Sequence, residues 1–372
     1  MSERRQADIV VVGAGPAGTA AAAHLGQLGL KNVVLLDKHD FPRDKTCGSG
    51  ISPKGIEVLR ALGVWDDVER EAYPITGMRL VTPGGLESYQ SAGDQAQAVV
   101  CMRRTLDHLI LKRALDAGVD FVPFFTADSL IEEHGRVVGV RAKDGREVRA
   151  RFTLVAGGTH CRLVPPRQSK RMIQAIMGWW DNVPFKRGHL EMVFDPMVLP
   201  YYGWLFPESA DRVNIGITYE DGPDGKRNAR ELFQAFLDKQ YKHRLRGATQ
   251  IGAWKGHPVA YSYDIENLTA PGRVTIGEAG LLTHPATAEG IYQGMKSGML
   301  AAEALRDVLH RGTSERAAFA DYERRCRSTF RVSFLGGGLF RTLIKTPVLD
   351  WIVRASEKPL VKHTAAKIMA AL

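Results

Sequence analysis

Two glycine-rich turns, one near each end of the chain, constrain the fold more than any other feature of this sequence. Residues 9–18 read I-V-V-V-G-A-G-P-A-G, and residues 271–298 read P-G-R-V-T-I-G-E-A-G followed by a proline-containing loop and a glycine-studded segment. Each has the pattern of a short apolar strand, a turn and a helix, which suits the binding of phosphate groups. Because the turns lie more than 250 residues apart, they predict one extended cofactor held from both ends of the fold, and FAD has that form.

The first turn belongs to a complete mononucleotide-binding unit. A strand is expected over 8–12, a helix over about 16–28 and a second strand over 32–36, which ends at an acid. The first glycine permits the tight turn, the second lets the backbone approach a pyrophosphate, and the third lets helix and strand pack closely. A glycine turn without a ligand is the alternative, and the strand, helix and acid together disfavour it. The residues expected at the cofactor are Gly13, Gly15, Pro16, Ala17, Gly18, Asp37 and Lys38.

Composition is that of a globular enzyme. The chain has 372 residues, 44% hydrophobic and 24% charged, which is enough for two domains or for one domain with an insertion. No signal peptide and no apolar run of membrane-spanning length are apparent. Four cysteines are scattered without metal-ligand spacing, so we expect no metal site and a reducing, cytoplasmic location. Nothing in the sequence sets the oligomeric state.

The C-terminal segment is basic and apolar at once. From residue 324 to the end there are ten Lys or Arg against two acids, mixed with aromatic and aliphatic residues. Such a mixture is typical of a surface that faces anionic lipid, which would make the protein peripheral at the inner face of the membrane. A helical cap with a solvated basic face is an equally weighted interpretation. Nucleic acid is disfavoured because no recognised binding module accompanies the charge.

The remaining pattern predicts an α/β fold: a Rossmann-type FAD-binding domain, an inserted antiparallel β-sheet domain for the substrate, and a helical C-terminal segment. Helices are expected over about 53–62, 105–117 and 229–237, and strands over 136–142, 147–149 and 152–155. The aromatic-rich stretch 171–257 reads as the substrate-facing sheet. The predicted FAD-binding domain comprises 1–75, 95–165 and 268–320, the sheet domain comprises 76–94 and 166–267, and the C-terminal segment comprises 321–372.

Several of these segments together resemble the geranylgeranyl reductase family, within the larger p-hydroxybenzoate hydroxylase-like group of FAD enzymes. They are F-P-R-D-K-T-C-G-S-G at 41–50, R-R-T-L-D at 103–107 and G-E-A-G at 277–280. In addition, Y-G-W-L-F-P at 202–207 is similar to the Y-x-W-x-F-P signature of that family. The likeness extends to about residue 310.

The resemblance implies further cofactor contacts. Gly277 and Glu278 stand where the family has a Gly-Asp pair at the ribityl chain and phosphates, and a helix beginning near Ala288 would point at the flavin. From its spacing alone, Arg103 is better explained as a surface arginine beside a helix. The positions implied at the cofactor are Arg43, Cys47, Gly48, Arg103, Gly277, Glu278, Pro285, Glu289, Gly290 and Ile291.

Cys47 matches a cysteine that this family places beside the flavin. Reduction of a C=C bond needs a hydride at one carbon and a proton at the other, and a thiol can supply the proton. The alternative is a small side chain buried in a tight turn. Tyr202, Trp204 and Phe206 alternate along an expected strand and so share one face. That face would be an apolar wall for a prenyl chain, although a sandwich core is the usual role of such strands.

One departure from the larger group concerns the source of electrons. Residues 155–161 read V-A-G-G-T-H-C, so Gly157 stands where hydroxylases of the group carry the aspartate of an Asp-Gly motif. Because no second dinucleotide-binding turn is present, the reductant is expected to be NAD(P)H bound transiently or a reduced protein carrier. His160 and Cys161 lack a third ligand at metal-binding spacing, so they are taken to end a strand.

The family resemblance predicts an FAD-dependent reductase that saturates C=C bonds of a prenyl lipid, such as a geranylgeranyl lipid, a menaquinone tail or another polyprenyl group. A flavin-dependent monooxygenase or halogenase of the same fold, acting on a hydrophobic or aromatic substrate, is the first alternative. The second is an FAD-binding protein at the membrane surface that carries out no turnover.

Overall fold

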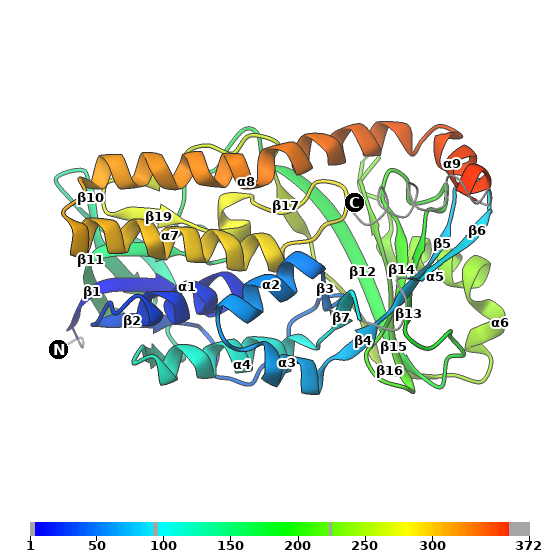
Figure 1. Cartoon of the computed structure of the whole chain (residues 1–372), viewed down its shortest axis with the longest axis horizontal. Coiled ribbons are helices and arrows are strands. Elements are labelled where there is room, and N and C mark those ends of the chain that lie inside the picture. Colours follow the sequence, from blue (N-terminus) through cyan, green and yellow to red (C-terminus); the bar gives the residue numbers. More distant parts are fainter. Residues whose placement is uncertain (1–3, 92–95, 223–224, 357–372) are drawn as a thin grey trace.

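A computed structural model describes residues 4–91, 96–222 and 225–356, and Figure 1 shows two sheet-containing halves connected by a long helix. The first half contains an eight-stranded sheet with the order β18-β19-β11-β1-β2-β8, to which β10 and β9 are added beside β11. Strands β19, β11, β1, β2 and β8 run parallel. The strands of this sheet are β1 (Arg4–Val12), β2 (Val33–Leu36), β8 (Asp120–Val122), β9 (Ala127–Glu133), β10 (Arg136–Ala142), β11 (Glu147–Val155), β18 (Thr269–Ala270) and β19 (Arg273–Thr275).

The glycine unit forms the centre of this half. The end of β1 is buried on both faces, as expected of a central parallel strand. It leads into α1 (Pro16–Gln27), and a Cβ on Gly18 would lie only 1.8 Å from the carbonyl oxygen of Gly13, so close packing there requires glycine. Helix α7 (Ile291–Arg311) packs equally closely on α1, because a Cβ on Gly298 would lie 2.4 Å from the oxygen of Ala17. The glycines that stud α7 therefore allow two helices to touch.

The second half is a sheet with the order β16-β12-β15-β14-β13-β5-β6, with β17 beside β12. The expected antiparallel arrangement holds for every pair except β5 and β13, which run parallel. Its strands are β5 (Gly77–Val81), β6 (Glu87–Ser91), β12 (Arg171–Asp181), β13 (His189–Val193), β14 (Gly203–Pro207), β15 (Arg212–Tyr219), β16 (Thr249–Gly256) and β17 (Val259–Tyr261). Helices α5 (Ala229–Gln240) and α6 (Lys242–Leu245) accompany it.

Smaller elements join the two halves. A three-stranded sheet consists of β3 (Gly50–Ile51), β7 (Ala98–Val100) and β4 (Tyr73–Ile75). Helices α2 (Pro53–Ala61), α3 (Trp65–Glu71) and α4 (Arg103–Asp116) belong to the first half, and the 3₁₀ turn η1 (Gly277–Gly280) precedes α7. Helix α2 begins as its sequence predicts, with Ser52 accepting a hydrogen bond from the Gly55 N–H and proline in the first turn.

Helix α8 (Glu315–Leu343) runs along both halves and is followed by α9 (Val348–Ser356), as Figure 1 shows. The predicted domain boundary at residue 320 falls inside α8, so the C-terminal helical segment has no break there. The division of the chain into domains otherwise stays a prediction, although the strands of the second sheet fall within 76–94 and 166–267. Part of the predicted C-terminal segment, 357–372, lies outside the described residues.

Several element boundaries differ from the expected ones. The strands expected over 147–149 and 152–155 are one strand, β11, whose first half pairs with β10 and whose second half pairs with β19. Strand β2 begins after Asn32, because Asn32 has a positive φ of 53°. The helix expected near Ala288 begins three residues later, because Ala288 has a φ of 55° and Gly290 forms the N-cap of α7.

Candidate functional site

A large cavity of 1260 Å³ lies where the two halves meet, and both contribute to its lining. It extends from the first glycine turn, through the loop around Cys47, to the aromatic side chains of the second sheet. Of the predicted cofactor and substrate residues, all line this cavity except Gly18, Gly277 and Pro285. The cavity therefore brings together segments that are distant in sequence, while the binding role of each residue stays a prediction.

The first glycine turn forms one end of the cavity. Gly13 has a φ of 103°, a conformation open to glycine, and the N-cap of α1, Gly15, has no side-chain cap to occupy the N–H groups of the first helical turn. Asp37 follows β2 and is 8% exposed. Its carboxylate accepts hydrogen bonds from the N–H groups of Ala14 and His39, at 2.7 and 2.9 Å, so the acid also fixes the turn.

Arg103 is buried, so its explanation as a surface arginine is wrong. Its guanidinium makes two hydrogen bonds of 2.7 Å to Asp107, one turn further along α4, and its Nη2 would lie 3.9 Å from a Cβ on Gly15. Arg43 approaches the same carboxylate, with 3.1 Å between Nη1 and Oδ2 of Asp107. Two cations on one buried acid leave net positive charge beside the glycine turn, which suits a pyrophosphate.

The loop that carries Cys47 lies across the middle of the cavity. The Cys47 side chain is half-buried, its sulfur accepts a hydrogen bond of 3.3 Å from the Ser49 N–H, and it also interacts with the Arg103 guanidinium. A Cβ on Gly48 would lie 3.3 Å from the Phe206 ring, and one on Gly50 would lie 3.1 Å from it. Glycines at these positions thus let the loop rest on the aromatic wall.

A cluster of nitrogen bases in the cavity was not foreseen from the sequence. Lys45 lies 3.3 Å from Nε2 of His257, measured from Nζ, and the rings of His257 and His160 are 5.5 Å apart. All three residues line the cavity. Burial and the Arg103 charge lower the pKa of Lys45, while burial and the Lys45 charge lower the pKa of His257 to about 4. His257 is therefore neutral at neutral pH, with its Nε2 within hydrogen-bonding distance of Lys45 Nζ.

Lys45 stands two residues before Cys47 in the same loop, and this proximity in the sequence was the one signal that could have placed it at the cavity. His257 follows β16 with no motif around it, and only the tertiary fold brings it to the cavity. His160, taken to end a strand, is indeed beyond the end of β11, but its ring faces the same cavity.

One wall of the cavity is formed by aromatic side chains of the second sheet. Tyr202, Trp204 and Phe206 all line the cavity, and their ring centroids follow one another at 6.2 and 6.1 Å. The hydroxyl of Tyr202 donates to the Thr287 carbonyl at 2.6 Å, and the indole N–H of Trp204 donates to Asn214 at 2.7 Å. Their polar atoms are thereby satisfied within the protein, and the rings present apolar surface.

Strand β14 separates this wall from a different core. Leu205, between Trp204 and Phe206, packs on the opposite face with Phe233 and Phe236 of α5. The sandwich-core alternative thus describes the Leu205 face, whereas the aromatic face is shared between the cavity and the C-terminal helices. Phe340 of α8 and Leu349 of α9 also line the cavity, and neither was among the predicted site residues.

The second glycine turn closes the cavity from the C-terminal side. Gly277 has a φ of 59°, a Cβ on it would lie 2.8 Å from the Cβ of Ala17, and its N–H donates to Ser297, so it packs η1 against α1. Glu278 lines the cavity, with one carboxylate oxygen accepting from the Ala260 N–H at 2.8 Å. Pro285 is buried beside the cavity without lining it.

The start of α7 has unused polar groups. Gly290 caps the helix without a side-chain hydrogen bond, and the buried hydroxyl of Thr283 beside it has no hydrogen-bond partner among the described residues. Glu289 accepts from Gln293 at 3.2 Å and lines the cavity with Ile291. Free N–H groups and an orphaned hydroxyl are what a polar ring edge would satisfy.

Gly157 is explained by packing. A Cβ there would lie 2.8 Å from the sulfur of Cys161, so the space that an aspartate side chain needs is filled by that cysteine. The loop nonetheless lines the cavity through Ala156 and Gly158.

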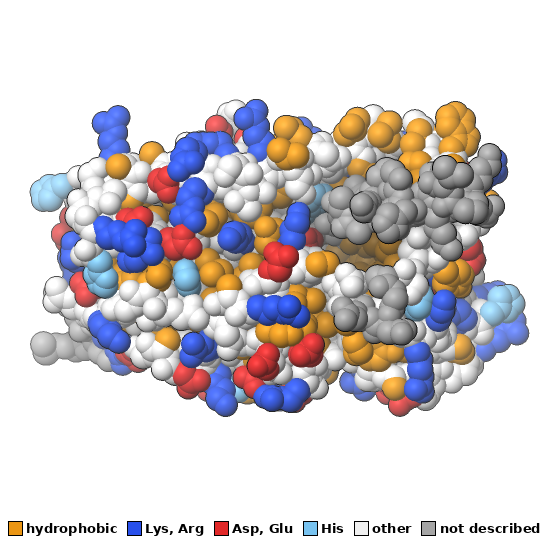
Figure 2. Space-filling view, in the orientation of Figure 1, with side chains coloured by type: hydrophobic (Ala, Val, Ile, Leu, Met, Phe, Trp, Pro, Cys, Tyr) orange, Lys and Arg blue, Asp and Glu red, His pale blue; other side chains and the backbone are white. Residues whose placement is uncertain are grey.

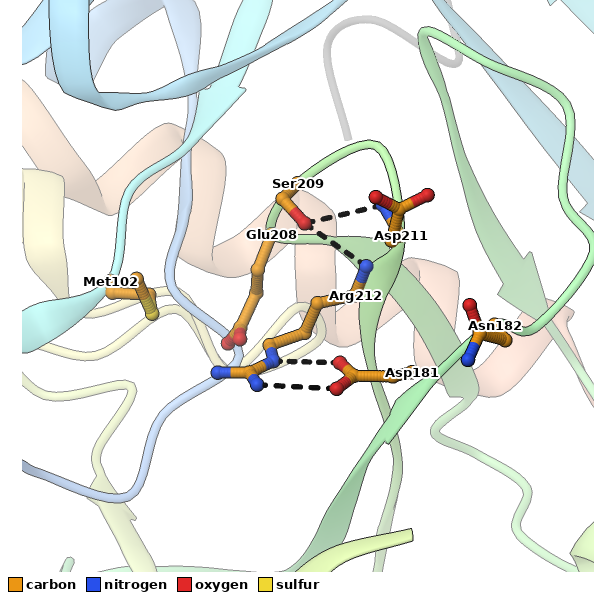
Figure 3. Close-up of a pocket in the computed structure, with 7 residues that line it drawn as sticks. All are labelled: Met102, Asp181, Asn182, Glu208, Ser209, Asp211 and Arg212. Atoms are coloured by element: carbon orange, nitrogen blue, oxygen red, sulfur yellow. Dashed lines mark hydrogen bonds and ion pairs between the residues drawn. The ribbon is translucent and has the colours of Figure 1, made fainter. Parts of the chain in front are cut away.

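A second hollow, of 370 Å³, lies beside the end of β12 and the start of β15 and is drawn in Figure 3. Two of its charged groups already pair, because Arg212 Nε lies 2.9 Å from Asp181 Oδ1, and the hydroxyl of Ser209 accepts from the backbone N–H groups of Asp211 and Arg212. Glu208 accepts from the Trp179 indole at 3.0 Å. Because its one arginine is already paired and its volume is small, this hollow is not the candidate site.

The residues of the large cavity fit FAD. Its volume, two helix N-termini without side-chain caps, the cationic groups near Gly15 and the orphaned Thr283 hydroxyl match a long ligand with a pyrophosphate and a polar ring edge. Among the described residues, no three His, Cys, Asp or Glu side chains gather as metal ligands. Of the described helices, none combines the length and apolar character needed to cross a bilayer.

Comparison with known proteins agrees with this cofactor. Residues 6–199 match the FAD binding domain family. The chain is 32% identical to menaquinone reductase of Mycobacterium tuberculosis, over 82% of this chain and 78% of that one. It is 26% identical to digeranylgeranylglycerophospholipid reductase 2 of Methanopyrus kandleri, over 88% of this chain and 84% of that one.

Solved structures show the same fold. A geranylgeranyl bacteriochlorophyll reductase-like protein of Thermoplasma acidophilum superposes with a TM-score of 0.81 at 22% identity, over 94% of this chain and 91% of that one. Flavin-dependent halogenases share the fold as well, at 19–21% identity. The family match over half of the chain, together with the relative of 32% identity, confirms the resemblance seen in the sequence. The chain is an FAD-dependent oxidoreductase and belongs to the geranylgeranyl reductase family.

Proposed function

We propose that this enzyme saturates C=C bonds in the prenyl chain of a membrane lipid, of the class to which geranylgeranyl lipids and the polyprenyl tails of quinones belong. One observation carries the proposal: a single cavity joins the glycine turn that suits a pyrophosphate to a wall of aromatic side chains, with the Cys47 loop between them. The names of the relatives, menaquinone reductase and digeranylgeranylglycerophospholipid reductase, support a polyisoprenoid substrate.

The residues proposed to hold FAD are those of the two glycine turns, with Asp37, Arg43, Arg103 and the start of α7. When bound and reduced, FAD supplies a hydride equivalent. Tyr202, Trp204 and Phe206 would hold the prenyl chain by apolar contact, since their polar atoms are bonded within the protein. The same rings exclude water from the reacting bond.

Cys47 is proposed to donate the proton. Its sulfur lies in the loop that rests on Phe206, so a chain held against the aromatic wall would pass the thiol. Proton transfer from sulfur to the second carbon leaves a thiolate, which the nearby Arg103 guanidinium is suited to stabilise. The thiol must then recover a proton from solvent before the next turnover.

The proposed electron source is NAD(P)H bound transiently, or a reduced protein carrier. The sequence supports this proposal because it has one glycine turn of the dinucleotide-binding type, which is assigned to FAD, and no second one for NAD(P)H. Because a prenyl lipid resides in a bilayer, the enzyme is also proposed to work as a peripheral protein at the inner face of the membrane.

The function is tested by reducing the FAD-loaded protein with dithionite under anaerobic conditions and adding a panel of prenyl lipids. Mass spectrometry should detect the gain of one H₂ for each bond saturated, and a matched lipid with a fully saturated chain should be unchanged. Gain of an oxygen atom or a halogen, once oxygen and halide are admitted, would assign the protein to the monooxygenase or halogenase class instead. No product from any lipid would favour an FAD-binding protein without turnover.

A further inference from the structure

The outer surface of the C-terminal helices carries an apolar stripe that nothing in the described structure covers. Five of the nine large hydrophobic side chains that are exposed in the described chain lie within α8 and α9. Figure 2 shows hydrophobic side chains along the upper edge of the molecule, over the second half of α8 as drawn in Figure 1. The stripe, with its exposed fractions, consists of Val332 (81%), Leu335 (53%), Leu339 (61%), Leu343 (38%) and Trp351 (64%).

The stripe is continuous on one helix face. Its four members on α8 are separated by three, four and four residues, which places them along one side of an α-helix. The opposite side of the same helices is already buried, through Phe330 and Phe334 on α8 and Leu349 and Val353 on α9. A helix that is apolar on both sides needs a partner for each side. The protein core covers one side, and within the described part of the chain the other side is left without a partner.

Charge identifies that partner. Between residues 324 and 356 there are seven Lys or Arg and one acid, Asp350. The Asp350 carboxylate faces inward, where it accepts hydrogen bonds from the Thr82 hydroxyl and the Gly84 N–H. Four of the seven cations pair with acids of the protein. The remaining three are exposed and form no ion pair among the described residues, and they flank the stripe at its start, middle and end: Arg331, Lys345 and Arg354.

We propose that this outer face, residues 331–354, docks on an anionic lipid bilayer. Apolar side chains inserted into the headgroup region, with unpaired cations beside them, are the combination that binds such a surface. A protein partner with an acidic, apolar groove would match the same pattern less well, because the α8 part of the stripe, Val332 to Leu343, is a convex helix face about three turns long that no polar residue interrupts before residue 342.

The position of the cavity adds a route for the substrate. Phe340, next to Leu339 of the stripe, and Leu349 on α9 both line the large cavity. The two helices therefore form a thin wall with the bilayer on one side and the cavity on the other. The prenyl chain enters past Phe340 and Leu349, directly from the membrane. This entry route rests on the proposed function, whereas docking does not.

Docking is tested by flotation of the FAD-loaded protein with vesicles that contain no prenyl lipid. We expect binding to vesicles of phosphatidylcholine with phosphatidylglycerol, and much weaker binding to phosphatidylcholine alone. The pair of changes Leu335→Glu and Leu339→Glu should abolish flotation, and Lys345→Gln should weaken it about fivefold, since one cation is lost. Leu115→Glu, an exposed leucine on α4, is the matched control and should float like the original protein.

Equal flotation of the double-Glu variant, or equal flotation with both vesicle types, would overturn docking. Loss of a dimer in the double-Glu variant, by sedimentation and without any vesicle binding, would also overturn it and make the stripe a self-association surface. The entry route is tested separately with prenyl lipid in vesicles and in detergent micelles. The double-Glu variant should lose turnover in vesicles and keep it in micelles. Failure of every variant in micelles would instead count against the proposed function.

Discussion

At the scale of single residues, the proposed role of Cys47 can be tested most directly. Cys47 lies in the cavity between the first glycine turn and the aromatic wall, its sulfur accepts a hydrogen bond from the Ser49 N–H, and it interacts with Arg103. If the thiol supplies the proton, Cys47→Ala should retain FAD and lose turnover by a factor of about one hundred or more. Flavin absorbance of the purified variant gives the first quantity, and product formation gives the second.

The control for Cys47→Ala is a second thiol. Cys161 also lines the cavity, but it lies in the loop after β11, beside Gly157. Cys161→Ala should cost much less activity. A loss of the same size in both variants would indicate that cavity packing is responsible, and undiminished activity in Cys47→Ala would remove the thiol from the mechanism.

His284 makes the stability of the protein depend on pH. Its Nδ1 accepts from the N–H groups of Ala286 and Thr287, and its Nε2 hydrogen-bonds the Ser333 carbonyl, so a neutral ring is fully satisfied. A proton on Nδ1 would face two donors. Burial lowers the pKa of His284 to about 4. Because the folded pKa lies below the unfolded value, this stability is present above about pH 6.5 and is lost as the pH falls toward 4.

We therefore expect His284 to account for a loss of about 2 kcal/mol in the free energy of unfolding between pH 7 and pH 5. Urea unfolding at the two pH values measures it. His257 titrates in the same range and contributes to the total, so the comparison is with His284→Gln, whose stability should vary less with pH. Equal pH dependence in the two proteins would show that the ring is not the group responsible.

How far the site could be predicted differs from residue to residue for a physical reason. Gly13, Gly15 and Asp37 were identifiable because a turn that approaches a phosphate has local sequence requirements. Lys45, His257 and Phe340 line one cavity only because the tertiary fold brings their segments there, and no local pattern marks them. Gly277 stays a predicted cofactor contact; in the structure it brings η1 close to α1, and such a packing constraint leaves the same glycine signature in the sequence.

At the scale of elements, the three consecutive glycines of α8 have different roles. A Cβ on Gly337 would lie 2.8 Å from the His284 ring, whereas one on Gly336 would meet nothing within 4 Å. Gly336→Ala should therefore raise the free energy of unfolding by about 0.5–1 kcal/mol, since alanine favours helix. Gly337→Ala should lower it by about 1–3 kcal/mol, since the buried ring must move. Urea unfolding of the two neighbours decides, and stabilisation by both would refute the close contact.

Elements with a clear period were predictable, and those decided by pairing were not. Strand β10 (Arg136–Ala142) and the start of α2 coincide with the expected residues. Strand β11 was expected as two strands. Its first half pairs with β10 and its second half with β19, and nothing in the local sequence shows that one strand has these two partners. Helix α7 begins three residues after the expected position. Ala288 has a left-handed backbone conformation, and a turn around His284 holds the residues before the helix.

At the scale of the whole molecule, α8 connects the two halves. Near its start, Glu315 accepts from the Gly272 N–H at 2.7 Å, and Glu323 accepts from the N–H groups of Leu268 and Thr269, all beside the first sheet. Near its end, Arg341 donates to the hydroxyls of Tyr261 and Tyr263 and pairs with Glu220, beside the second sheet. Polar anchors at both ends thus hold one helix across the cavity.

Arg341 should therefore control whether the C-terminal helices stay closed over the cavity. Arg341→Met removes a cation that three buried or half-buried partners share, so we expect α8 from about residue 337 and α9 to open locally while the first sheet and its FAD site remain folded. Faster amide hydrogen exchange in 337–356 with unchanged exchange in α1 would show this, and FAD content should not fall. Arg331→Met on the same helix, which removes an exposed arginine with no ion pair in the described structure, is the control. If exchange rises equally in α1, Arg341 stabilises the entire fold, and the helices and the sheets unfold as one unit.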